Sequence, residues 1–210
     1  MDSSPSKERV IQASISLFNA KGFDGTSIRD IATLANVNVA IVSYYFKNKK
    51  GLMEYLLSDF LNQYIKVMED VLHLSISASV TLHEMTRALL EFQTEKRDLA
   101  RFVYREMTLD NVLIREVMTT YLAKEKFYLN QLFERGVRSK EFRKMSIPAV
   151  ITQFKGMLSM PFLQPQYLTE VLHVIPYEDY FIKQYKKEIE NWINHTICRL
   201  PTQQLQAALF

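Results

Sequence analysis

Residues 26–46 of the chain read TSIRDIATLANVNVAIVSYYF. The apolar side chains in the first half of this stretch recur at helical spacing and are Ile28, Ile31, Ala32 and Ala35. They predict a short helix over residues 27–35. Asn36 tolerates the left-handed backbone that ends a helix, and Asn38 can cap a following helix over residues 39–46. The stretch therefore predicts two short helices joined by a tight turn.

The flanking segments predict one helix before this pair and one after it. Upstream, apolar residues between Val10 and Phe18 favour an amphipathic helix over residues 6–20, which the glycine-containing segment 21–25 then ends. Downstream, polar residues at 47–51 precede a long helix whose apolar positions run from Leu52 to Met68. Because no flexible linker follows the pair, this long helix can transmit a rotation between the two parts of the chain.

The composition predicts that the rest of the chain is helical as well. Only five glycines and six prolines occur in 210 residues, which is too few turn residues for a fold of short strands. Further helices are expected over residues 81–96, 98–107, 148–160 and 177–199, and one or two more over residues 111–136. We therefore expect an all-α protein with two domains. Residues 1–50 form a helix-turn-helix domain, here called the reading head, and residues 51–210 form a helical dimerisation and regulatory domain.

The reading head carries side chains suited to double-stranded DNA. In a helix-turn-helix unit the second helix of the pair enters the major groove, so its exposed face should hydrogen-bond bases and contact thymine methyl groups. The start of the first helix can donate to a phosphate, and lysines beyond the second helix can neutralise the backbone. The expected DNA-contacting residues are Thr26, Ser27, Asn38, Val39, Ala40, Ser43, Tyr44, Tyr45, Lys47, Lys49 and Lys50. Of these, Tyr45 is expected to contact DNA and also to pack in the protein core.

The distribution of charge agrees with a phosphate-bearing partner. Residues 1–50 contain seven basic and four acidic side chains, whereas the other 160 residues contain 19 of each. The whole surplus of +3 therefore lies in the reading head. Solvated lysines are the simpler explanation of so small a surplus, so charge by itself leaves the two interpretations about even.

Other classes of function find little support in the sequence. The four histidines show no metal-ligand spacing, and Cys198 has no second cysteine, so we expect no metal and no cofactor. A glycine-rich phosphate loop, a nucleophile elbow and a paired-carboxylate motif are all missing, so an enzyme is not expected. The apolar runs are too short to span a bilayer. The expectation is a cytoplasmic, nucleoid-associated protein with no membrane partner.

Three segments together resemble the TetR family of regulators. They are FNAKGFDGTSIRDIA at 18–32, VN at 37–38 and YYFKNK at 44–49. The resemblance covers about the first 55 residues. It implies an all-helical, homodimeric DNA-binding protein with a variable C-terminal domain. Ala40 stands where glycine is common and Ser43 where tyrosine is common, so the base preference does not transfer from relatives.

Segments of the remainder are similar to a TetR-family regulator of the division protein FtsZ in sporulating, Bacillus-type bacteria. They are residues 101–107, 113–118, 121–127 and 165–172. This resemblance implies a dimer that binds palindromic motifs near the chromosome origin and acts on FtsZ while bound to DNA. The alternative is a ligand-responsive repressor, released from its operator when an unidentified small apolar effector enters the C-terminal bundle.

Dimerisation is also expected from geometry. One helix-turn-helix unit covers a single half-site, and a two-fold operator needs two heads about 34 Å apart or a multiple of that. The expected interface involves the helices near residues 148–160 and 177–199. Its candidate anchors are Phe181, Ile189 and Trp192, and the alternative role of these residues is packing inside one subunit.

Overall fold

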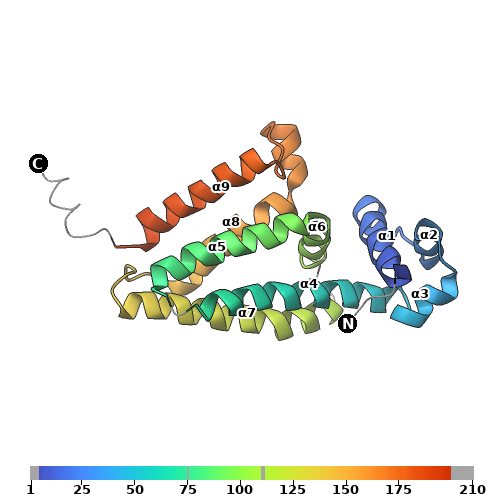
Figure 1. The fold of residues 1–210 in the computed structure, drawn as a ribbon, viewed down its shortest axis with the longest axis horizontal. Helices are drawn as coiled ribbons and strands as arrows, with labels where there is room; N and C mark the ends of the chain where they lie inside the picture. Colours follow the sequence, from blue (N-terminus) through green and yellow to red (C-terminus); the bar gives the residue numbers. More distant parts are fainter. Residues whose placement is uncertain (1–4, 75, 110–111, 200–210) are drawn as a thin grey trace, which may run out of the picture. The chain divides into compact units, whose positions relative to one another are not determined.

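The computed structural model describes residues 5–74, 76–109 and 112–199 and is built from α-helices (Figure 1). The helices are α1 Pro5–Lys21, α2 Ile28–Leu34, α3 Val39–Phe46, α4 Lys49–Leu72, α5 Ala78–Glu95, α6 Arg97–Glu106, α7 Val112–Arg138, α8 Ile147–Leu163 and α9 Asp179–Trp192. Two π-helical turns, Tyr167–Val171 and Ile193–Ile197, follow α8 and α9. An isolated antiparallel bridge joins Phe142 to Cys198. The all-α expectation is confirmed.

The chain divides into two compact units. The head unit contains Met1–Gln63 and Lys96–Thr120, and the body unit contains Tyr64–Glu95 and Tyr121–Phe210. The reading head therefore belongs wholly to the head unit, which also includes α6 and the first parts of α4 and α7. The two compact units therefore divide the chain differently from the predicted domains, whose boundary lies at residue 50.

The core of the head unit forms where α1 packs against α2, α3 and α6. The rings of Phe18 in α1 and Phe102 in α6 are both fully buried and stack with their centroids 5.2 Å apart. Polar contacts join the same two helices, because Arg105 Nη2 donates to the Phe18 carbonyl at 2.7 Å and Asn19 Nδ2 donates to the Asp98 carbonyl at 2.7 Å. This packing supports the short helices of the reading head, which are too brief to be stable in isolation.

In the body unit, α5 packs against α8 and α9. The Glu125 carboxylate is buried here and accepts hydrogen bonds from the Tyr64 hydroxyl, at 3.1 Å, and from Lys155 Nζ. A buried carboxylate requires such partners, since desolvation without them is costly. In the same unit, the Phe142 ring fills the space where a side chain on Gly136 would lie.

Several helix boundaries differ from the sequence-based expectation. The polar segment 47–51 was expected to separate two helices, yet α4 already begins at Lys49. The segment expected to form one or two helices is the single helix α7, whose expected first residue, Asn111, lies outside the described residues. The final expected helix, 177–199, begins at Asp179 and changes to a π-helical turn after Trp192.

The helix expected over residues 148–160 extends to Leu163 as α8, so Pro161 lies inside it. Proline lacks the amide hydrogen that would pair with the carbonyl four residues earlier, which here belongs to Met157. The Tyr185 hydroxyl of α9 donates to this carbonyl at 2.7 Å. Burial raises the pKa of Tyr185 to about 12, so the hydroxyl keeps its proton for this bond. The contact from α9 therefore explains why α8 tolerates the proline.

Candidate nucleic-acid interface

The helix-turn-helix begins with a capping box on α2. Ser27 is the N-cap residue, and its hydroxyl accepts a hydrogen bond from the Asp30 amide at 3.1 Å. The Asp30 carboxylate in return accepts from the Ser27 amide at 2.8 Å and from the Ser27 hydroxyl at 2.7 Å. These bonds lower the pKa of Asp30 below its ordinary value. The exposed Ser27 hydroxyl is thus already committed to its own helix.

The turn between α2 and α3 is held by local backbone geometry. Asn36 has a φ of 51°, so the expected left-handed conformation is confirmed. Asn38 is the N-cap of α3, and its side-chain oxygen accepts from the Ala40 amide at 2.8 Å. From α1, Arg9 Nε donates to the carbonyl of Ala35, the last residue before the turn, at 3.1 Å. The direction of α3 is therefore fixed from both sides of the turn.

The two faces of α3 differ sharply in exposure. Val42 and Phe46 point into the core of the head unit and are buried. The opposite face is exposed and consists of Asn38, Val39, Ala40, Ser43 and Tyr44. The Tyr44 side chain is 80% exposed, so its ring and hydroxyl are accessible to a partner.

Tyr45 lies between these two faces. It is partly buried, and its ring meets the Tyr44 ring edge-on with the centroids 5.1 Å apart. On its other side it contacts Phe46, with ring centroids 6.1 Å apart. Tyr45 thus contributes to the core of the head unit and also supports the exposed ring of Tyr44.

The position of Thr26 corrects the expected DNA-contacting surface. Its hydroxyl was expected to donate to phosphate, but the residue is only 2% exposed. The hydroxyl instead donates to the carbonyls of Gly22, at 2.8 Å, and Leu17, at 3.3 Å. The reason is that the loop after α1 folds back on the last turn of that helix, so the hydroxyl satisfies carbonyls that the helix end leaves unpaired.

The three lysines after α3 occupy different environments. Lys47 is exposed and has φ 64° and ψ −57°, and the Asn48 amide donates to the Phe46 carbonyl at 2.7 Å. This is a γ-turn of the rare, strained kind, and it separates α3 from α4. Lys50 is exposed. The positions of Lys47 and Lys50 are compatible with phosphate contacts.

Lys49 is different, because its ammonium group is engaged within the head unit. Nζ donates to the carbonyls of Phe23 and Thr26, both at 2.9 Å, and lies 4.4 Å from the centroid of the Phe23 ring. Lys49 thereby ties the α1–α2 loop to the start of α4. We call this set of contacts the Lys49 clamp. Its carbonyl acceptors lie more than twenty residues away in sequence, which is why the sequence pattern placed Lys49 with the other two cations.

The candidate dimer anchors differ in exposure in the folded body unit. Ile189 is only 1% exposed and packs within its own chain, which corrects its expected role as an anchor. Phe181 and Trp192 are partly exposed, and the Phe181 ring stacks on Tyr185 with the centroids 5.4 Å apart. Phe181 and Trp192 therefore remain accessible to a second subunit.

Sequence reasoning passed over two residues that build the site. Asp30 was not assigned a role, although a serine followed three residues later by an acidic residue is the signature of a capping box. Arg9 was not assigned any role, and no local pattern links it to Ala35, 26 residues away. Within the described ranges, no cluster of metal-ligating side chains occurs, and no helix is long and apolar enough to cross a membrane.

Comparison with known proteins agrees with this geometry. The family model described as "Bacterial regulatory proteins, tetR family" matches residues 10–56. The chain is 47% identical over 190 residues to the probable HTH-type transcriptional regulator YttP of Bacillus subtilis, covering 89% of this chain and 91% of that protein.

Solved structures show the same fold over most of the chain. The ketosteroid transcriptional regulator KstR2 of Mycobacterium tuberculosis aligns with a TM-score of 0.77 at 14% identity, covering 95% of this chain and 98% of that one. FadR of Bacillus subtilis, solved in complex with stearoyl-CoA, aligns with a TM-score of 0.68 at 16% identity, covering 86% and 95%. All these relatives and neighbours are transcriptional regulators, not enzymes. The chain therefore belongs to the TetR family of DNA-binding transcriptional regulators.

Proposed function

We propose that the chain binds palindromic chromosomal motifs as a homodimer and regulates the division protein FtsZ while bound to DNA. The observation that carries the DNA-binding part is the exposed face of α3, which presents hydrogen-bonding and apolar side chains on a rigid, capped helix. A helix with this kind of face fits the major groove, where base pairs are distinguished by donors, acceptors and the thymine methyl group.

The residues of this face have separate roles in the proposal. Ser43 and Tyr44 hydrogen-bond base edges or phosphates, and Val39 and Ala40 contact thymine methyl groups. The Asn38 side-chain oxygen caps α3, which leaves its amide nitrogen as the group that can donate to DNA.

Contacts to the DNA backbone come from the two ends of the helix pair. Lys47 and Lys50 neutralise phosphates at one end, and the exposed start of α2 at Ser27 approaches a phosphate at the other. These contacts supply affinity and fix the docking register, whereas the face of α3 supplies sequence preference.

Homodimerisation follows from the shape of the target. A palindromic site needs two heads about 34 Å apart or a multiple of that. Phe181 and Trp192 of α9 are partly exposed aromatic side chains in the body unit, and such side chains are enriched at the centres of protein interfaces. We assign them to the interface with the second subunit.

The FtsZ-directed role rests on the resemblance of four segments to RefZ, a regulator of FtsZ. Two of these segments, 121–127 and 165–172, carry exposed large apolar residues, namely Phe127, Tyr167, Val171 and Leu172. Exposed apolar residues of this size are suited to contact with another protein. They support the proposal of a protein partner.

The second candidate is a repressor controlled by a small apolar effector. It is favoured by the shared fold with FadR, whose structure contains stearoyl-CoA. In that case binding of an effector in the body unit would move the two reading heads apart and release the operator. α4 provides the mechanical link, because it is one continuous helix from Lys49 to Leu72 and contributes to both units.

A map of bound DNA sites across the genome, paired with the transcript profile of a deletion strain, separates the two candidates. A few palindromes near the chromosome origin, with transcripts of the neighbouring genes unchanged on deletion, support the FtsZ-directed role. Sites at promoters whose transcripts rise on deletion overturn that role and favour the effector-controlled repressor. The absence of any specific sites would overturn both.

A further inference from the structure

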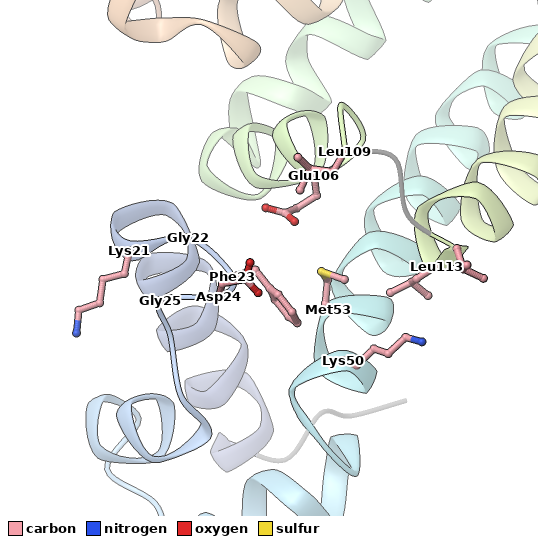
Figure 2. A pocket seen from close by; sticks show the side chains of 11 residues that line it. Lys21, Gly22, Phe23, Asp24, Gly25, Lys50, Met53, Glu106, Leu109 and Leu113 are labelled. Atoms are coloured by element: carbon pink, nitrogen blue, oxygen red, sulfur yellow. The ribbon is translucent and has the colours of Figure 1, made fainter.

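A cavity of about 540 Å³ lies inside the head unit, on the side of the α1–α2 loop that faces α4, α6 and α7 (Figure 2). Its walls come from four separate parts of the unit: the loop itself, the start of α4, the end of α6 and the start of α7. Apolar side chains cover much of the lining, and Phe23, Met53 and Leu113 are among them. The volume is in the range of small-molecule sites.

The polar groups of this cavity are arranged unevenly. Figure 2 shows the Glu106 carboxylate of α6 directed toward the α1–α2 loop, where Asp24 carries a second carboxylate. The ammonium groups of Lys21 and Lys50 extend away from Glu106. The pocket is therefore lined by one buried carboxylate, on Glu106, and one exposed carboxylate, on Asp24, and neither lysine is directed toward Glu106.

Glu106 is unusual for a buried charge. The residue is only 3% exposed, and among the described residues its carboxylate has one hydrogen-bonding partner, Arg105 Nη2, at the long distance of 3.4 Å. The same Arg105 nitrogen makes a much shorter bond, 2.7 Å, to the Phe18 carbonyl. Burial raises the pKa of Glu106, and the charge of Asp24 raises it further against the opposing effect of Arg105. A buried carboxylate in this position gains strongly from a cation.

We propose that this cavity is a binding site for a small amphipathic amine. The ammonium group would sit between Glu106 and Asp24 and donate hydrogen bonds to both carboxylates. The apolar body of the amine would lie against Phe23, Met53 and Leu113. An anion would meet two like charges in the same place, and a neutral apolar molecule would leave the Glu106 charge poorly paired. The charge pattern therefore selects a cation with an apolar substituent.

The position of the cavity gives such a ligand access to the reading head. Phe23 lines the cavity with its side chain, while its carbonyl and ring are both held by the Lys49 clamp. The occupant would therefore contact the loop that leads directly into α2. An effect of the amine on DNA binding would rest on the proposed function. Binding of the amine to the pocket does not, so we test amine binding in the absence of DNA.

The test uses the full-length chain, phenethylamine as the probe and the methyl signal of Met53 as the reporter. The chain contains nine methionines, so the Met53 signal in ¹³C-methyl-methionine NMR spectra is assigned from its loss in Met53→Leu. Phenethylamine is expected to shift this signal saturably, and its neutral isostere 2-phenylethanol to bind at least about tenfold more weakly, because it lacks the charge that pairs with the carboxylates.

Two variants and a matched control locate the charge contact. Glu106→Gln keeps the shape of the side chain and is expected to weaken amine binding by about tenfold or more. Asp24→Asn alters an exposed residue, so folding is not at risk, and is expected to weaken binding by about threefold, since exposed charges contribute less. Glu116→Gln removes an exposed charge from α7 and is expected to leave the affinity unchanged.

Three results would overturn the proposal: no saturable shift of the Met53 signal, equal affinities for the amine and the alcohol, or unchanged amine affinity in the carboxylate variants. If Glu106→Gln fails to fold, Asp24→Asn decides by itself. Loss of DNA binding in a separate assay, with amine binding intact, would count against the proposed function and leave this site standing.

Discussion

Replacing Lys49 by methionine tests whether this residue stabilises the head unit or contacts DNA. The change keeps most of the apolar stem but removes both hydrogen bonds of the Lys49 clamp, each 2.9 Å long, and the ammonium group 4.4 Å from the Phe23 centroid. A hydrogen bond to a charged group contributes about 1.5–3 kcal/mol, and a cation–π contact at an exposed site about 0.5–1 kcal/mol. Because Lys49 is partly exposed, we take the lower values.

These contributions predict a loss of about 3.5 kcal/mol in the free energy of unfolding of Lys49→Met. In a chain of this length that corresponds to a decrease in melting temperature of roughly 7–14 °C. Thermal and urea unfolding measure the loss. Lys50→Met is the matched control, because Lys50 is exposed and adjacent, and its unfolding free energy should change by less than about 0.5 kcal/mol.

The salt dependence of DNA binding is expected to depend on Lys50 and not on Lys49, whereas stability depends on Lys49 and not on Lys50. Each lost phosphate contact reduces the slope of log K against log salt concentration by about 0.9. We expect that reduction for Lys50→Met and none for Lys49→Met, measured by fluorescence anisotropy below the melting temperature of each variant. If Lys49→Met keeps wild-type stability and shows the smaller slope, the Lys49 ammonium binds phosphate and the reasoning from the clamp is refuted.

Three further predictions concern α2, α3 and α8. Tyr44→Ala should leave the unfolding free energy within about 0.5 kcal/mol, because the ring is 80% exposed, yet weaken DNA binding by about 1–3 kcal/mol; wild-type affinity in an anisotropy titration would contradict this. Ser27→Ala should lower the unfolding free energy by about 1 kcal/mol in urea titrations. The Ser27 bonds lower the pKa of Asp30 below 3.8, so their contribution to the free energy of unfolding is present above that pH and is lost as the pH falls through the lowered pKa. A difference in unfolding free energy between wild type and Ser27→Ala that stays constant in acid would be inconsistent with the capping box. Tyr185→Phe should lower the free energy of unfolding by about 1–3 kcal/mol, and adding Pro161→Ala should recover part of this loss by supplying the missing amide donor. Additive effects of the two substitutions in a double-mutant cycle would show that the Tyr185 hydroxyl does not compensate for Pro161.

The sequence by itself determined the helix-turn-helix and the family. α3 begins and ends at the predicted residues, and Ser27, Asn36 and Asn38 lie at the helix ends that their side chains favour. These features are predictable because each depends on bonds between residues at most four positions apart. The all-α class could be predicted from composition and hydrophobic spacing for the same reason, because helices form from interactions between residues close in sequence.

Only the tertiary structure decided which side chains of the reading head face outward. Thr26 and Lys49 have the polar character of surface residues, yet their groups satisfy carbonyls of the α1–α2 loop and the end of α1. A sequence window reports that a donor is present, but not which acceptor the fold brings to it. Ile189 is the apolar counterpart, because its hydrophobicity suited an interface and a core equally until folding placed it in the core.

The helix through Pro161 and the cavity beside Glu106 depend on long-range contacts in the same way. The proline is tolerated because a hydroxyl 28 residues beyond Met157 replaces its missing donor, and the cavity exists because four separate segments converge around a buried carboxylate. Local propensity determines where helices form. The pairing of buried polar groups is decided by packing between distant segments, since only a completed fold removes their water and makes an unpaired group costly.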